Sequence, residues 1–140
     1  MTFVVDASVV LRWFAPQEPG NAEARQWFAR FIADADLFVA PDVLRFEVLG
    51  GLARLQVTYE EGWAERSFSR FERLGLRLLT TDMEIAERAL QLSRELKVGG
   101  YDAVYLAHAE SLGMSWLTAD RRVVRRLAGD PRIEPLLENG

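Results

Sequence analysis

Four acidic residues, Asp6, Glu47, Asp102 and Asp120, are the strongest candidates for chemistry in this sequence. Asp6 and Asp120 closely follow short apolar runs that read as buried strands, and open parallel sheets bind ligands beyond the carboxyl ends of their strands. Carboxylates brought together repel one another, and Mg²⁺ or Mn²⁺, which prefer oxygen ligands, are the usual remedy. The four acids therefore predict one metal-binding pocket suited to phosphodiester hydrolysis.

Each acid also has a purely structural interpretation. Asp6, Asp102 and Asp120 all stand where a helix is expected to begin, and an aspartate there commonly caps the free N–H groups of the first turn. Glu47 differs, because it shares a predicted helical face with apolar residues that should point inward. A buried carboxylate needs a cation, hydrogen bonds or protonation, so the alternatives for Glu47 are a core salt bridge with an arginine or a place at the solvent boundary.

Two hydroxyl residues accompany the acids. Ser8 and Thr118 each lie two positions from an aspartate, Asp6 and Asp120 respectively. We expect them to hydrogen-bond the carboxylates, a water or a phosphate, with turn or capping roles as the alternative. His108 lies six positions after Asp102, well off the same helical face, and is interpreted as structural or surface-exposed.

The composition limits the remaining possibilities. The chain has 140 residues, 49% of them hydrophobic and 27% charged, which predicts a single domain over residues 1–140. Absence of cysteine excludes disulfides, thiolate zinc sites and cysteine nucleophiles. Neither a signal peptide nor a membrane span is evident, so we expect a cytoplasmic protein without membrane contact. A net charge of −4 means that any contact with nucleic acid is local.

The elements that position these residues alternate between strand and helix along the chain. Apolar runs predict strands at 3–5, 37–40, 76–79, 116–118 and 132–134. Helical periodicity predicts helices at 9–14, 21–32, 41–56, 60–74, 82–97, from 102 onward, and 120–127. Such alternation with short connections predicts an α/β fold, with a parallel sheet covered by helices on both faces.

The acids and their flanking residues resemble the PIN-domain family and, within it, the VapC-type ribonuclease toxins of toxin–antitoxin modules. The segments that carry this resemblance are 4–8 (VVDAS), 41–47 (PDVLRFE), 101–107 (YDAVYLA) and 117–120 (LTAD). The family's acidic positions carry over onto all four acids, and its hydroxyl positions onto Ser8 and Thr118. The resemblance implies a three-layer α/β/α sandwich with strand order 3-2-1-4-5. It also implies cleavage of RNA with Mg²⁺ or Mn²⁺, a homodimer and a VapB-type antitoxin partner.

That strand order separates Asp120 from Asp82, which follows a similar run of residues. Strand four would lie beside strand one, whereas strand three would lie two places away, roughly 10 Å at the usual spacing. We therefore interpret Asp82 as a helix cap. A basic surface follows Asp120 and is expected to steer an RNA backbone towards the acids, with a solvated helix face as the alternative. It consists of Arg126 and of the main candidates for backbone contacts, Arg121, Arg122 and Arg125.

The leading hypothesis is a metal-dependent endoribonuclease that acts as the toxin of such a pair. A phosphatase or phosphoacceptor domain of similar architecture fits poorly, because Ser8 stands where a second acid would be needed and no lysine follows a late strand. The alternative from another class is a PIN-like module that binds RNA or assembles with partners without catalysis.

Overall fold

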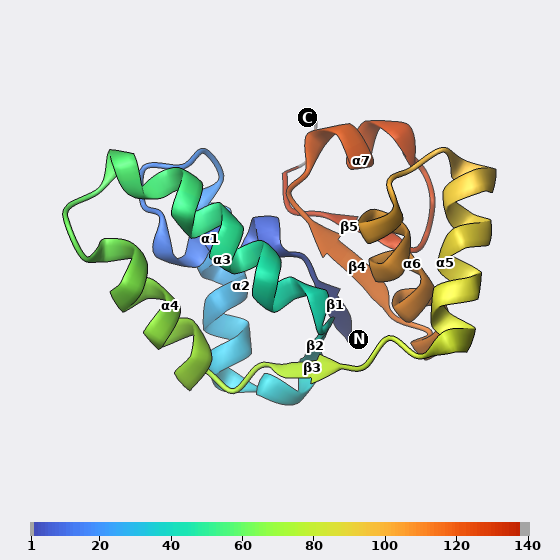
Figure 1. Ribbon diagram of the computed structural model, residues 1–140, viewed down its shortest axis with the longest axis horizontal. Helices are drawn as coiled ribbons and strands as arrows, with labels where there is room; N and C mark the ends of the chain where they lie inside the picture. The colour runs from blue at the N-terminus through green and yellow to red at the C-terminus, as the bar shows by residue number, and fades with distance from the viewer. Residues whose placement is uncertain (1, 138–140) are drawn as a thin grey trace.

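The computed structural model describes residues 2–137, and its centre is a five-stranded parallel sheet (Figure 1). The strand order is β3-β2-β1-β4-β5, which confirms the predicted order. Both neighbours of the central strand pair with it in parallel register. The strands are β1 (Phe3–Val5), β2 (Phe38–Pro41), β3 (Arg77–Leu79), β4 (Ser115–Thr118) and β5 (Ile133–Pro135).

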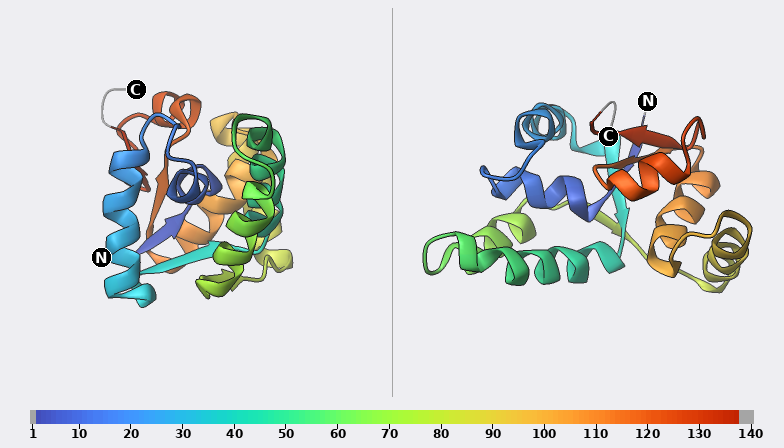
Figure 2. Two further views of the ribbon diagram at one scale, coloured as in Figure 1. Left: turned by 90° about the vertical axis from the view of Figure 1, so that its left-hand side faces the viewer. Right: turned by 90° about the horizontal axis from the view of Figure 1, so that it is seen from above.

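Within residues 2–137, seven α-helices surround the sheet and complete the predicted three-layer sandwich. The first four lie on one face and α5 and α6 on the other (Figure 1; Figure 2, right). The α3–α4 pair extends away from the sheet, and short 3₁₀ turns at Ala35–Leu37 and Gln56–Thr58 complete the connections. The helices are α1 (Ala7–Phe14), α2 (Asn21–Ala33), α3 (Val43–Leu55), α4 (Trp63–Arg73), α5 (Met83–Leu96), α6 (Gly100–Leu112) and α7 (Arg121–Arg126).

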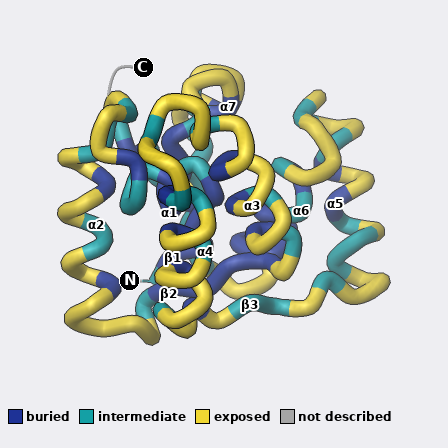
Figure 3. The backbone as a smooth tube through the Cα atoms, turned by 60° about the vertical axis from the view of Figure 1, so that its left-hand side comes forward, coloured by how far each residue is buried: buried dark blue, intermediate teal, exposed yellow. Residues whose placement is uncertain are grey.

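The buried positions gather on the sheet and on the inner sides of the helices (Figure 3). Strands β1 and β2 are buried at every residue, as expected of central strands covered on both faces. Helix α6 is also deeply buried, since every residue from Tyr105 to Ala109 is inaccessible to solvent or nearly so. Among the described residues, no helix is both long and apolar enough to cross a membrane.

The helix boundaries differ from the prediction in two places that matter for the site. Helix α1 begins at Ala7, directly after Asp6, rather than at Val9. Helix α6 begins at Gly100 rather than at Asp102, because the chain enters it through Gly99 in an extended conformation and glycine at the second position does not block the first turn. Asp102 therefore lies inside the first turn of α6.

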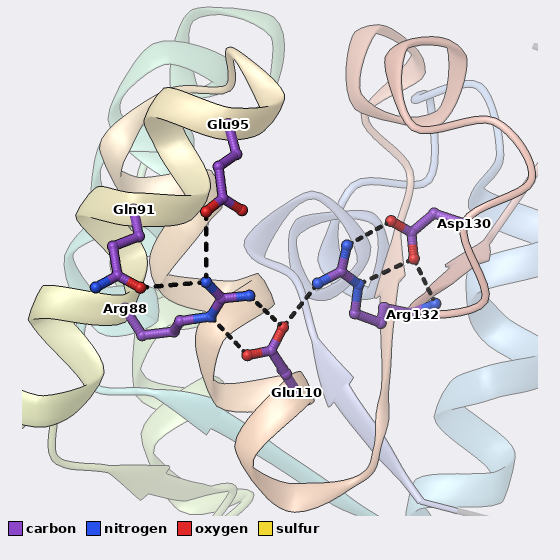
Figure 4. A network of polar contacts seen from close by, with 6 residues as sticks. All are labelled: Arg88, Gln91, Glu95, Glu110, Asp130 and Arg132. Atoms are coloured by element: carbon purple, nitrogen blue, oxygen red, sulfur yellow. Dashed lines mark hydrogen bonds and ion pairs between the residues drawn. The ribbon is translucent and has the colours of Figure 1, made fainter.

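A network of ion pairs ties α5 and α6 to the segment that precedes β5 (Figure 4). Arg88 on α5 donates two hydrogen bonds to Glu110 on α6, at 2.7 and 3.0 Å. Arg132 bridges the same glutamate, at 2.8 Å, to Asp130, at 2.7 Å. Every carboxylate of this network, hereafter the α5–α6 ion network, thus has an arginine partner.

Candidate active site

Asp6 occupies the carboxyl end of the central strand, and its side chain is buried. Its N–H donates to the carbonyl of Leu117 at 2.9 Å, which fixes the turn against β4. One carboxylate oxygen, Oδ1, accepts a hydrogen bond from the indole Nε1–H of Trp116 at 3.2 Å. The other, Oδ2, accepts from the backbone N–H of Ser8 at 3.1 Å, so Asp6 also caps α1. Capping and a place in the site therefore coexist in this residue.

Ser8 and Thr118 join the ends of β1 and β4 around the same carboxylate. The hydroxyls of both residues donate to Asp6 Oδ2, that of Thr118 at 3.3 Å. Ser8 Oγ accepts the N–H of Ala119 at 2.9 Å, and Thr118 Oγ1 accepts the N–H of Asp120 at 3.1 Å. The two hydroxyls thus hold the Asp6 carboxylate and the backbone leading to Asp120 in one hydrogen-bonded unit.

Glu47 lies one turn into α3 and is half-buried. It takes part in no ion pair of the described residues, so the predicted alternative of a core salt bridge is wrong. Its Oε1 instead accepts a hydrogen bond from the hydroxyl of Tyr105 on α6, at 2.6 Å. The helix comes close to α1 because Gly51 has no side chain: a Cβ there would lie 2.2 Å from Leu11 Cδ1. Glycine at this position therefore lets α3 bring Glu47 towards Asp6.

Asp102 and Asp120 approach the same place from α6 and from the turn after β4. Asp120 caps α7, since its Oδ1 accepts the N–H groups of Arg122, at 3.0 Å, and Val123, at 3.4 Å. Asp102 is not a cap, because Gly99 holds the N-cap position of α6, and the capping alternative for it is therefore wrong. The Asp102 side chain is partly buried. Helix capping therefore explains the positions of Asp6 and Asp120 but not those of Asp102 and Glu47.

Electrostatic effects show that the four acids lie near one another. Burial is the largest cause that raises the pKa of Asp6, and the charge of Asp120 adds to it. Burial likewise raises the pKa of Glu47, with contributions from Asp6 and Asp102. Burial and then the charges of Asp6 and Asp120 raise the pKa of Asp102 to about 6. The cluster therefore holds negative charges that repel one another and that its own hydrogen bonds only partly offset.

The acids are spaced more widely than the ligands of an all-protein metal cage. Among residues 2–137, no three acidic or histidine side chains converge closely enough to hold an ion by themselves. Mg²⁺ commonly keeps several water ligands and takes only one or two carboxylates directly. The arrangement thus suits a hydrated ion bound between the carboxylates better than one enclosed by all four.

Tyr105 and Trp116 are site residues that sequence analysis missed. Both side chains are fully buried, and their rings stack with centroids 5.5 Å apart and an interplanar angle of 11°. One ring donates a hydrogen bond to Glu47 and the other to Asp6. Burial and the nearby carboxylates raise the pKa of Tyr105, so its hydroxyl stays a donor. The signal available in the sequence was a polar-tipped aromatic residue three positions after Asp102 and another two before Thr118, both within apolar runs.

Asp82 and His108, which the sequence analysis excluded from the site, have structural roles. Asp82 caps α5, since its Oδ1 accepts the N–H of Ile85 at 2.9 Å. His108 is buried, and its Nε2 lies 3.0 Å from the hydroxyl of Thr81, which in turn donates to Asp42. Burial lowers the pKa of His108, which fits a neutral, structural imidazole.

The arginines after Asp120 divide between two faces of α7. Arg122 and Arg126 lie four residues apart and line a hollow beside Asp102, whereas Arg121 and Arg125 belong to another face. Arg122 makes the only ion pair of α7 among the described residues, a long contact of 3.8 Å to Asp120. Of the arginines in the predicted basic surface, the structure brings Arg122 and Arg126 into the hollow beside Asp102.

Comparison with known proteins gives a family and a fold. A sequence profile described as "PIN domain" matches residues 3–130, and no curated protein sequence matches significantly. A chain of a toxin–antitoxin complex from Klebsiella pneumoniae is 20% identical, with a TM-score of 0.69 over 99% of both chains. PAE2754 from Pyrobaculum aerophilum is 17% identical, with a TM-score of 0.70 over 97% of this chain and 91% of that one. At these identities the two structures speak for the fold alone.

Proposed function

The chain belongs to the PIN-domain family, whose members are generally nucleases, and we propose that it is a metal-dependent endoribonuclease, the toxin of a toxin–antitoxin pair. We assign the activity to one domain over residues 1–140, with Asp6, Glu47, Asp102 and Asp120 as its acidic site. RNA is the substrate in this proposal, and the cytoplasm is where the protein would meet it.

One observation carries this proposal: carboxylates from four separate segments come together, and burial, with added repulsion between them, raises the pKa values of Asp6, Glu47 and Asp102. No ion pair of the described residues involves any of these three. Packing that serves stability alone would supply a cation or hydrophobic residues instead, because unpaired charges in a partly buried cluster cost free energy. The donor set consists only of oxygen atoms, which fits Mg²⁺ or Mn²⁺ and not a softer metal.

Asp6, Glu47, Asp102 and Asp120 are the residues that would hold the ion. A divalent cation bound there supplies a water of lowered pKa and neutralises charge on the leaving oxygen. Asp6 is held rigidly by Trp116, Ser8 and Thr118, so it offers a carboxylate whose orientation is fixed before any ligand arrives. Glu47 and Asp102 are partly exposed to solvent and are suited to accept a proton from a water or to orient it.

Partner proteins form the second part of the proposal. The Klebsiella structure is that of a toxin–antitoxin complex, and we propose a VapB-type antitoxin for this chain as well. An apolar groove of about 440 Å³ between α3 and α4, lined by Leu52 and Phe68 among others, supports it, because grooves between helices receive apolar segments of partners. We also propose a homodimer, supported by large exposed apolar side chains on α5 and α6: Met83, Leu90 and Tyr101.

The decisive experiment is cleavage of a labelled single-stranded RNA by the purified chain, with Mg²⁺, Mn²⁺ or a chelator. We expect cleavage with either metal and none with the chelator. Asp120→Asn should abolish it, whereas Asp82→Asn should not. These two variants are matched, because both aspartates cap a helix after a strand and asparagine caps equally well.

Two outcomes would contradict the proposal. Full activity of Asp120→Asn would show that the acids are not the site. RNA binding without cleavage in any metal would instead support the alternative of a PIN-like binding module. Growth arrest on expression, relieved by co-expression of the neighbouring reading frame, tests the toxin role separately.

A further inference from the structure

A polar hollow of about 410 Å³ lies directly beside the acidic site. Its walls come from the end of α5, from the start of α6 and from α7, and the connection between α5 and α6 passes next to α7 (Figure 1). Lys97 comes from the first of these elements, Asp102 from the second, and Arg122 and Arg126 from the third. Whatever fills the hollow therefore touches one of the four acids and three cations.

Two of the three cations that line this hollow have no ion-pair partner among the described residues. Within residues 2–137, Lys97 and Arg126 form no ion pair, and Arg122 forms only the 3.8 Å contact with Asp120. Arg122 is also close enough to lower the pKa of Asp102. By contrast, Arg88, which also lies on α5, pairs with Glu95 and Glu110. The hollow thus gathers positive charge that remains available to a ligand.

The backbone at Lys97 is unusual as well. It ends α5 with φ 56° and ψ 45°, the only residue other than glycine with a positive φ among those described. Glycine is favoured at such helix ends, and another residue costs on the order of 1 kcal/mol there. Lys97 is also the only lysine of the chain. A strained backbone position is thus occupied by a cation that faces the hollow, a combination that points to a role in binding.

An RNA substrate meets an electrostatic problem at this site, because its phosphates must approach a cluster of carboxylates on a chain of net charge −4. Local cations are the usual solution, since contacts from lysine and arginine to phosphates position the strand without reading its bases. We propose that the hollow of Lys97, Arg122 and Arg126 is a phosphate subsite, which binds one backbone phosphate of the RNA next to the bond cleaved at the acids. This inference rests on the proposed nuclease function, adds Lys97 to the substrate-binding residues and selects Arg122 and Arg126 among the arginines that follow Asp120.

The test is binding of a fluorescent single-stranded RNA to the whole chain in the presence of a chelator, so that no cleavage occurs. Lys97→Gly and Arg126→Gln should each weaken binding about 5-fold. Each should also reduce the slope of log Kd against log salt by up to about 0.7, the value for complete loss of one phosphate contact on a single strand. Arg25→Gln is the matched control, because Arg25 is an exposed arginine of α2 that makes no ion pair among the described residues.

Lys97→Gly separates binding from folding. Glycine suits the positive φ, so this variant should be at least as stable as the wild type while it binds RNA less tightly. With metal present, KM should rise and kcat should change little. If both variants bind RNA with the affinity and salt slope of Arg25→Gln while the wild type still cleaves RNA, the phosphate subsite is wrong and the nuclease stands.

These experiments thus distinguish failure of the phosphate subsite from failure of the proposed nuclease function. Wild-type RNA binding that depends on Lys97 and Arg126, without cleavage in any metal, would uphold the subsite and contradict the nuclease. Inorganic phosphate serves as the probe for a free anion. If it displaces the RNA at micromolar concentration, the hollow is a site for small phosphates and the assignment to the RNA backbone is overturned.

Discussion

In the α5–α6 ion network, Glu110 pairs with Arg88 and Arg132, and Asp130 pairs with Arg132. At the acidic site, Asp6 and Asp102 instead lie near further acids and have no ion-pair partner among the described residues. Hydrogen bonds from Arg88 lower the pKa of Glu110, and those from Arg132 lower the pKa of Asp130. Burial and like charges do the opposite at the acidic site. The charged carboxylates of the network therefore stabilise the folded state, whereas charge on the carboxylates of the acidic site destabilises it.

The largest expected difference between the acidic site and the α5–α6 ion network is in how their variants respond to a bound metal ion. With Mn²⁺ at about 100 times its Kd, the free energy of unfolding of the wild type should rise by about 2.7 kcal/mol, because the ion binds only the folded state. Asp120→Asn should lose most of this gain. Glu110→Gln should keep it on a lower baseline, since the network does not touch the site. Urea denaturation with and without Mn²⁺ measures both. An equal gain in Asp120→Asn would remove Asp120 from the site.

Tyr105→Phe should weaken Mn²⁺ binding about 10-fold, because residues that orient metal-binding carboxylates typically contribute that much. The variant removes only the hydroxyl that donates to Glu47 and leaves the ring stacked on Trp116. Calorimetric titration with Mn²⁺ gives the affinity. Tyr59→Phe is the control, since the Tyr59 hydroxyl accepts the N–H of Gln17 in a separate part of the fold. Equal affinities in the two variants would make Tyr105 a packing residue only.

Stability without metal should change in opposite directions in the two regions. Asp102→Asn should stabilise the chain by about 1 kcal/mol, because it removes a repelled charge; partial exposure to water makes the gain smaller than the raised pKa alone implies. Glu110→Gln should destabilise it by up to about 1 kcal/mol, because Arg88 and Arg132 each lose one of their two carboxylate partners. Denaturant midpoints test this. A destabilised Asp102→Asn would mean that its carboxylate serves the fold.

The pH dependence of stability is the smallest of these effects. The pKa of Asp102 is about 6 in the folded chain against an ordinary 3.8, so the unfolded state releases its proton first as pH rises. Stability contributed by protonated Asp102 is therefore lost between about pH 4 and 6. The lowered pKa values of Glu110 and Asp130 act the other way, since their contribution is lost as pH falls below about 4. Asp102→Asn should flatten the decline above pH 4 in thermal melts, and an unchanged decline would assign it to other groups.

Much of the fold was predictable because its signals are local. Runs such as Phe3–Val5 are apolar on both faces and identify central parallel strands, and alternation with helices fixes the fold class. The strand order came from family resemblance, because periodicity does not encode which strands pair. The start of α6 was misplaced at Asp102 because glycines usually end helices, whereas here Gly99 precedes the helix and Gly100 begins it.

The acids of the site were predictable one by one, but their surroundings were not. Spacing in the sequence shows that Glu47 shares a helical face with buried residues, yet it does not show that the partner is a tyrosine 58 residues away. Trp116 was likewise assigned only to a strand, because a hydrogen bond from its indole to Asp6 depends on how β4 lies beside β1. Lys97 was not among the candidates for RNA contacts, because the approach of the end of α5 to α7 depends on packing between distant segments.

The pairing of β1 with β4 also has a consequence for the time at which activity can begin. Thr118 and Asp6, which it brings into contact, are 112 residues apart, so the site is incomplete until almost the whole chain has been synthesised. At 5 to 20 residues per second, this delay is roughly 10 s. If the proposed nuclease activity requires this contact, nascent chains are inactive throughout the delay. An inhibitor protein that is made first would therefore be present before each new active site closes.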